Sequence, residues 1–221
     1  MAQRLRIKFC RGEEIKFISH LDMVRLWERA IRRARVPLSY SQGFSPHPQL
    51  SFAVPLTVGM TSEAELLDIF CTRSVSPDWV RDILSQELPA GIKILEIYQV
   101  NPSEPSLQSL ASFAEYVTEV ETERSLEEVE MAVKNLLSLK TLPWQHQRDT
   151  GIKSYDLRPL INDIHLISCY KGTCTLKMQL RCDALGSGRP EQVTAALGFA
   201  ERPTSIHRVG LKLMPANVSV S

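Results

Sequence analysis

The stretch from Phe17 to Phe52 constrains the fold more than any other, because it encodes a helix with defined ends and an unusual surface. Ser19 and Asp22 have the spacing of a capping box, in which two side chains satisfy free backbone donors at a helix start. We therefore expect a helix that begins near His20. Pro37 lacks an amide hydrogen and disfavours helical geometry at the preceding residue, so the helix must end before it.

The two sides of this expected helix differ in chemistry. With 3.6 residues per turn, apolar side chains form a stripe that is typical of a helix packed against a sheet. The stripe consists of Met23, Val24, Trp27, Ala30, Ile31 and Ala34. The other side carries the arginines Arg25, Arg29, Arg32 and Arg33, with only Asp22 and Glu28 nearby. Guanidinium groups gathered in this way suit phosphate groups, which they bind through paired N–H donors.

A polar and aromatic loop follows the helix over residues 40–48. One interpretation is that arginines, aromatic rings and histidines line an RNA-facing groove, where phosphates are bound and bases stack. The candidate RNA-binding residues are then Arg25, Arg29, Arg32, Arg33, Tyr40, Gln42, Phe44, His47 and His20. A second interpretation is that the arginines only solvate the helix and the loop is a turn. A third is a protein-binding surface.

Charges are distributed unevenly along the chain, although its net charge is only +1. Residues 1–50 hold 10 Lys and Arg against 4 Asp and Glu, a balance of +6. Residues 51–135 hold 5 against 15, or −10, and residues 136–221 hold 11 against 6, or +5. A polyanion site is therefore expected at one of the two ends of the sequence.

The composition is ordinary for a soluble globular protein, with 43% hydrophobic and 23% charged residues. No apolar run reaches the roughly 18 residues of a membrane helix, and residues 1–10 lack the apolar core of a signal peptide. We therefore expect a cytoplasmic protein without membrane contact. Cys174 and Cys182 share the inward phase of one expected strand, which favours buried thiols over metal ligands. We expect no metal site and no cofactor.

The order of strand and helix patterns predicts the fold class. Residues 4–9 alternate basic and apolar side chains, so we expect a strand with one buried face and one basic face. The arginine helix follows, then strands at 50–54 and 66–72, a helix from Pro77 and a strand at 92–100. The second helix is expected to bury Trp79, Val80, Ile83, Leu84 and Leu88. This order is the ferredoxin-like arrangement βαββαβ.

The second half repeats this pattern. Residues 102–112 contain two prolines and are expected to form a linker. Residues 113–221 again alternate strands with two helices, the first of which starts at a capping box formed by Ser125 and Glu128. We therefore expect an α+β protein of two tandem ferredoxin-like domains, residues 1–101 and 113–221. Their sheets should be mostly antiparallel, with helices on one face.

The middle of the second half holds further polar candidates. Residues 142–149 and 154–161 are expected to form an uneven hairpin. Its turn, residues 148–151, loosely resembles the R-x-D-x-G core of tRNA pseudouridine synthases, in which Asp149 would be catalytic. A plain hairpin turn is the other interpretation. Asp156 and Arg158 are expected to pair across the sheet or to contact RNA or a protein partner, and residues 186–188 are expected to be flexible.

The sequence holds no established catalytic signature. It lacks a phosphate-binding glycine loop, an H-E-x-x-H pair and a nucleophile elbow. We therefore assign no catalytic residue. The alternative is that His20 or His47 acts as a general base in RNA cleavage, as in the CRISPR repeat-processing endoribonucleases, which also have ferredoxin-like folds.

Several segments resemble a known family. They are SHLD, RLWERAIRRA, VPLSYSQGFSPHPQLSFAVPL, SEAELLDI, PSLQSLASFAEY and SYDLRPLI. They are similar to the radical-SAM-linked protein family, a domain of unknown function that is also found as a carboxy-terminal extension of B12-binding radical SAM proteins. The resemblance implies association with a radical SAM enzyme. The five cysteines include no C-x-x-x-C-x-x-C triplet, so the chain itself is not expected to be that enzyme.

These observations predict a non-catalytic RNA-binding accessory module that works with a radical SAM enzyme in RNA modification or processing. One alternative is an RNA-processing or RNA-modifying enzyme, endoribonuclease-like or pseudouridine-synthase-like. The other is a protein-docking module that binds the radical SAM partner without RNA.

Overall fold

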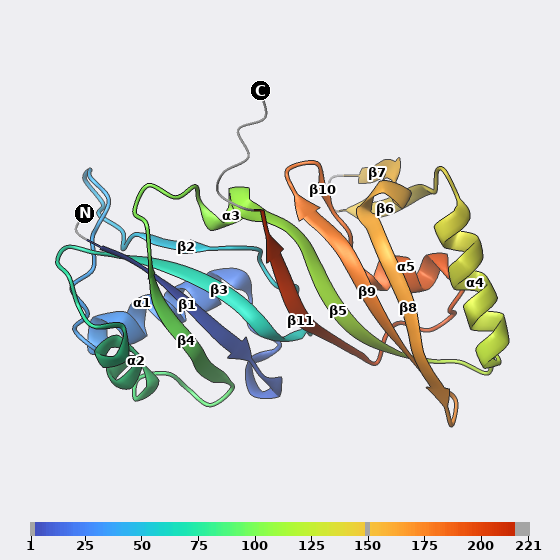
Figure 1. Ribbon diagram of the computed structural model, residues 1–221, viewed down its shortest axis with the longest axis horizontal. Helices are drawn as coiled ribbons and strands as arrows, with labels where there is room; N and C mark the ends of the chain where they lie inside the picture. The colour runs from blue at the N-terminus through green and yellow to red at the C-terminus, as the bar shows by residue number, and fades with distance from the viewer. Residues whose placement is uncertain (1–2, 149–150, 215–221) are drawn as a thin grey trace. The chain divides into compact units, whose positions relative to one another are not determined.

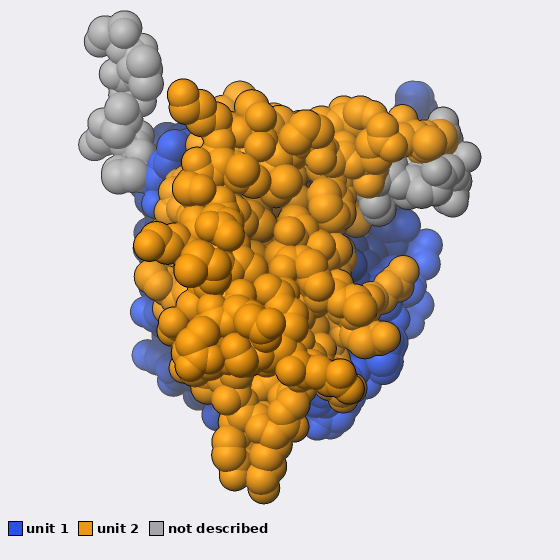
Figure 2. Space-filling view, turned by 90° about the vertical axis from the view of Figure 1, so that its right-hand side faces the viewer, with its two compact units in different colours: residues 1–111, 213–221 blue, residues 112–212 orange. Residues whose placement is uncertain are grey.

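The computed structural model describes residues 3–148 and 151–214 (Figure 1). The chain divides into two compact units (Figure 2), of which unit 1 comprises residues 1–111 with 213–221 and unit 2 comprises residues 112–212. Both mix helices with sheets whose described pairings within each unit are antiparallel. The expected α+β class with mostly antiparallel strands is therefore confirmed.

Unit 1 has the order of elements that the sequence predicts. It contains β1 (Gln3–Arg11), α1 (His20–Arg33), β2 (Leu50–Phe52), β3 (Thr61–Cys71), α2 (Pro77–Ser85), β4 (Ile92–Val100) and the short α3 (Leu107–Leu110). A 3-10 turn, Glu13–Ile15, connects β1 to the segment before α1. The strand order across the sheet is β4-β1-β3-β2.

The core of unit 1 lies between this sheet and the helices α1 and α2. Trp27 is fully buried, and its ring meets that of Phe9 edge-on with centroids 4.9 Å apart. The Ser19 hydroxyl accepts a hydrogen bond from the backbone N–H of Asp22, so α1 starts where predicted. It ends at Arg33, and Arg35 then adopts the left-handed conformation with a φ of 54°. The helix therefore terminates in a local turn before Pro37 can interrupt it.

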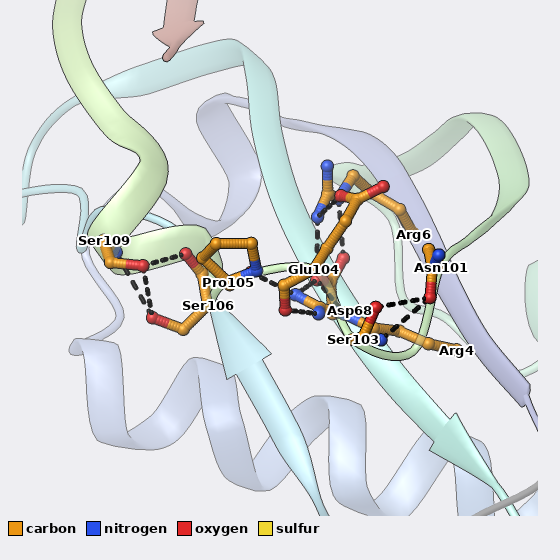
Figure 3. Close-up of polar contacts among 9 residues, drawn as sticks. All are labelled: Arg4, Arg6, Asp68, Asn101, Ser103, Glu104, Pro105, Ser106 and Ser109. Carbon is orange, nitrogen blue, oxygen red and sulfur yellow. Dashed lines mark hydrogen bonds and ion pairs between the residues drawn. The ribbon is translucent and has the colours of Figure 1, made fainter. Parts of the chain in front are cut away.

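The opposite face of β1 is not an exposed basic surface, and that expectation was wrong. Arg4 and Arg6 are buried, and each Nε donates to the carboxylate of Asp68 at 2.8 Å. The Arg4 guanidinium also donates to the carbonyl oxygens of Glu104 at 2.6 Å and Pro105 at 2.9 Å, as Figure 3 shows. The segment expected as a linker thus covers part of this sheet face, because the two arginines need acceptors there.

Trp79 was also misassigned. It is 42% exposed, whereas Val80 and Leu84 are fully buried. The short helix α2 buries positions one turn apart, and Trp79 lies about 100° round the helix from Val80. The apolar stripe is therefore narrower than the sequence pattern indicated.

Unit 2 repeats the strand order of unit 1. It contains β5 (Ala111–Glu121), α4 (Leu126–Ser138), β6 (Pro143–Arg148), β7 (Gly151–Asp156), β8 (Ile161–Tyr170), β9 (Thr173–Asp183), β10 (Gly186–Ser187), α5 (Pro190–Ala196) and β11 (Ser205–Leu213). Counting β5, β8, β9 and β11 as first to fourth gives the order fourth-first-third-second, as in unit 1. The predicted hairpin is present as β6 and β7, between α4 and β8. The capping box at Ser125 and Glu128 is confirmed.

One expectation about polar residues in unit 2 was wrong. Asp156 and Arg158 do not pair. The Asp156 carboxylate accepts from the backbone N–H of Leu142 at 2.7 Å and of Arg158 at 3.0 Å. The Arg158 guanidinium donates to the carbonyl oxygens of Leu137 and Leu139 at the end of α4. Both side chains satisfy backbone groups that the helix end and hairpin leave open.

Two other expectations for unit 2 were also wrong. Cys174 is not a free thiol, because it forms a disulfide with Cys169, directly opposite on β8. Cys182 is a buried free thiol, as expected. Residues 186–188 are not a loose linker: β10 pairs with β9, and a side chain at Gly186 would clash with Leu160, 2.6 Å from the position of its Cβ.

Within the described ranges, none of the helices combines the length and apolar character needed to cross a membrane.

Candidate nucleic-acid interface

The arginines of α1 lie on its exposed side, opposite the buried Trp27. Arg25 makes a long ion pair with Asp22, at 3.3 Å, one turn earlier on the helix. Arg29 and Arg32 are exposed, and neither makes an ion pair or a side-chain hydrogen bond with any residue in 3–148 or 151–214. The guanidinium groups of Arg29 and Arg32 can therefore offer all of their N–H donors to a ligand.

Arg33 differs from these arginines. Its Nε donates to the Glu87 carboxylate at 2.6 Å, and its terminal nitrogen donates to the Glu87 carbonyl oxygen at 2.6 Å. This contact ties the end of α1 to Glu87, two residues beyond the end of α2. The Glu87 carboxylate already compensates part of the Arg33 charge, so Arg33 contributes less to an anion site than Arg29 or Arg32.

The loop after α1 is a narrow hairpin with a fixed base. Ser39 donates its backbone N–H to Phe70 on β3 at 2.7 Å, and Gln49 donates to Ser39 at 2.9 Å. One step further, the backbone N–H of Ser41 donates to the carbonyl of His47 at 2.9 Å, and the N–H of His47 donates to the Ser41 hydroxyl at 3.0 Å. These bonds hold residues 41–47, which we call the 41–47 loop, as an extension of the sheet.

The tip of the 41–47 loop presents bare polar and aromatic side chains. Phe44 is fully exposed, and Gln42 and His47 are exposed as well. Gly43 adopts a φ of 130°, which permits the tight tip. Tyr40, at the base, is 43% exposed. The Phe44 ring is therefore wholly accessible to solvent at the tip of the loop.

The candidate residues are distributed along α1 and over the loop that follows it. Leu38 bridges to Cys71 at the base of the loop, only five residues beyond the end of α1, so Arg32 and the loop belong to one end of unit 1 (Figure 1). His20 is the first residue of the 14-residue α1, which places it about 21 Å from the other end of the helix. His20 therefore lies at the opposite end of α1 from the residues that lead into the 41–47 loop.

His20 instead packs inward. Its ring meets Phe52 edge-on with centroids 5.4 Å apart. Burial lowers the pKa of His20 below its ordinary value; the negative charge of Glu65 opposes that shift and the positive charge of Arg11 adds to it. The His20 ring is therefore partly buried against Phe52.

This inward placement gives a pH prediction. Because the pKa is lower in the folded chain than in the unfolded chain, the unfolded state gains the proton first as the pH falls. Stability from neutral His20 is complete above the ordinary histidine pKa and is lost as the pH falls through the lowered one. Denaturant melts between about pH 7 and pH 5 should show a smaller loss for His20→Phe than for the parent. An equal loss in both chains would contradict the assignment.

Sequence reasoning missed two features of this surface. The Arg33 and Glu87 contact joins residues 54 positions apart, and nothing local signals it. Phe17, just before α1, is 72% exposed and was not among the predicted contacts. Asp149, the candidate from the pseudouridine-synthase pattern, lies outside the described residues.

Solved structures show what the fold resembles. A chain in the crystal structure of a Cbf5-Nop10-Gar1 complex matches with a TM-score of 0.52 at 8% identity, covering 94% of this chain and 48% of that one. A chain in the archaeal box H/ACA sRNP Nop10-Cbf5 complex gives 0.47 at 10% identity, covering 92% and 46%. This chain thus spans about half the length of those chains. At such identity the first likeness concerns the fold alone.

Among curated proteins, none matches the sequence significantly. A family model does match residues 4–190, which is most of the chain. The chain therefore belongs to the family described as uncharacterized protein conserved in bacteria (DUF2344).

Proposed function

We propose that this chain is a non-catalytic RNA-binding module that uses the exposed side of α1 and the 41–47 loop. One observation carries the proposal. Arg29 and Arg32 stand exposed with no partner among the described residues, and the loop that follows α1 holds the fully exposed Phe44 at its tip. Guanidinium groups bind phosphates and rings stack on unpaired bases, so both kinds of RNA contact are available together.

The architecture favours this face over the other face of unit 1. Small RNA-binding domains with four-stranded sheets often stack bases on the open sheet. Here the Glu104 and Pro105 carbonyls and the Asp68 carboxylate already occupy the Arg4 and Arg6 donors. Phosphates cannot use those arginines while these contacts persist, which leaves α1 and the loop.

We also infer that both units are ferredoxin-like domains, with repeated cores in residues 1–101 and 113–221 joined by residues 102–112. The shared order of strands in the two sheets supports this. The β6 and β7 hairpin is then an insertion in the second copy.

A radical SAM enzyme is the proposed partner, and this part rests on the sequence resemblance alone. In this role the module would present RNA to the enzyme. The competing proposal of an RNA-modifying enzyme predicts turnover of RNA by the isolated chain. The competing docking proposal predicts capture of the enzyme without RNA.

The first test concerns Arg29 and Arg32. Each phosphate contact releases counterions, so changing both residues to Ala should reduce the slope of log affinity against log salt by about 1 to 2 units. Fluorescence anisotropy with bulk and synthetic RNA at several salt concentrations measures this slope. The matched control is Arg73→Ala with Arg81→Ala, two exposed arginines near and on α2, which should leave the slope unchanged.

Loss of the Phe44 ring should change RNA binding in a different way from loss of the Arg29 and Arg32 charges. Phe44→Ala should weaken RNA binding by about 1–3 kcal/mol and leave the salt slope nearly unchanged, because a ring carries no charge. Thermal melts of Phe44→Ala should match the parent, since the side chain is exposed.

If the double arginine variant binds RNA like the parent yet fails to capture the radical SAM enzyme, α1 is a protein-docking surface and the RNA proposal fails.

A further inference from the structure

We propose that Phe17 is a second stacking residue of the RNA surface, so that the ligand is a single-stranded RNA segment that runs along α1 between two rings. The inference rests on the proposed RNA binding and names its substrate class. Phe44 holds one end of the segment and Phe17 the other, with Arg25, Arg29 and Arg32 between them.

Phe17 is placed as a platform for an external group. Its neighbours Ile15 and Ile18 pack in the core, whereas its own ring is 72% exposed. The segment is fixed by its backbone: Gly59 donates its N–H to the Lys16 carbonyl at 2.7 Å, and Arg11 donates to the same oxygen at 2.9 Å. A Cβ at Gly59 would lie 4.0 Å from the ring, so the loop passes close to one edge of Phe17.

The positive charge of Lys16 near the Phe17 ring suits a polyanionic ligand. The Lys16 Nζ lies 5.2 Å from the Phe17 ring centroid and also pairs with Glu13 at 2.6 Å. A lysine beside an exposed ring offers a phosphate contact next to a stacking surface. Leu21, the second residue of α1, is 67% exposed and begins the exposed side that continues through the arginines. An apolar protein partner would gain little from this run of positive charge, whereas a nucleic acid strand uses both features.

Distance along α1 defines the length of the ligand. The helix has 14 residues and is therefore about 21 Å long, which is the length that a strand bound along α1 would cover. A stacked strand rises about 3.4 Å per nucleotide, so about six nucleotides span this distance. Bases in a duplex are not free to stack on protein rings, which restricts the ligand to single-stranded or looped RNA.

The test uses end-labelled oligouridylates of about three to twelve nucleotides, titrated against the full chain by fluorescence anisotropy. Parent affinity should rise until the strand spans both rings. Phe17→Ala should weaken binding of the longest strand about five- to 150-fold, the equivalent of one lost stacking contact. It should leave the shortest strand unaffected. Phe17→Trp should restore the long-strand affinity, and Val58→Ala, a half-exposed residue in the adjacent loop, should change nothing.

The outcomes separate this inference from the proposed function. If Phe17→Ala binds every strand like the parent while the Arg29 and Arg32 variant loses salt-dependent binding, the inference fails and the RNA module stands. If neither variant affects RNA binding, the proposed function fails as well. If Phe17→Ala keeps its RNA affinity but loses capture of the radical SAM enzyme, the ring is a protein contact and the inference is overturned.

Discussion

Trp27→Ala should lower the free energy of unfolding by about 3–5 kcal/mol, because it removes a large side chain from a packed core. Trp27 is fully buried between α1 and the sheet, with Phe9 against its ring. The indole Nε1 is buried without a hydrogen-bond partner among the described residues, so the ring contributes through packing alone. Urea melts followed by circular dichroism measure the change without relying on the tryptophan signal.

Trp79 provides the matched control for this experiment. It is the same residue type in the same unit, but it lies 42% exposed on α2. Trp79→Ala should therefore cost about 1 kcal/mol or less. If the two variants lose equal stability, the helical phase of α1 is wrong, and with it the exposed position of the arginines.

Asp68→Asn should be similarly destabilising, by about 3–5 kcal/mol, because it leaves buried guanidinium groups without their carboxylate. Asp68 is fully buried and pairs with both Arg4 and Arg6. The substitution keeps the size and shape of the side chain, so a large loss reports charge rather than packing. Thermal melts and urea melts should both detect it.

Glu104 tests whether the effect depends on burial. Its carboxylate lies 3.4 Å from Arg6, and its side chain is 27% exposed, so water compensates much of a lost charge. Glu104→Gln should cost less than about 1 kcal/mol. A small loss for Asp68→Asn, comparable to that of Glu104→Gln, would show that water reaches the arginines and that residues 101–105 do not close this face.

The sequence by itself determined the elements and the position of the basic surface. Caps at Ser19 and Ser125 and the period of apolar residues located α1 and α4, because these signals act within one or two turns of the chain. The order of strands and helices in unit 1 followed from similar local patterns. The same spacing placed Arg29 and Arg32 on the exposed side of α1, since a residue opposite a buried stripe must face water.

Only the tertiary structure decided which arginines are exposed to a ligand and which are paired within the protein. Nothing in the sequence distinguishes the paired arginines from the exposed Arg29 and Arg32. The structure buries Arg4 and Arg6 against Asp68, and it pairs Arg33 with Glu87. A lone aspartate in the apolar segment around Asp68 was a usable signal, because a buried charge requires a partner. Its partners Arg4 and Arg6 lie more than 60 residues away in the sequence, and pairing over that separation depends on strand register that local patterns do not encode.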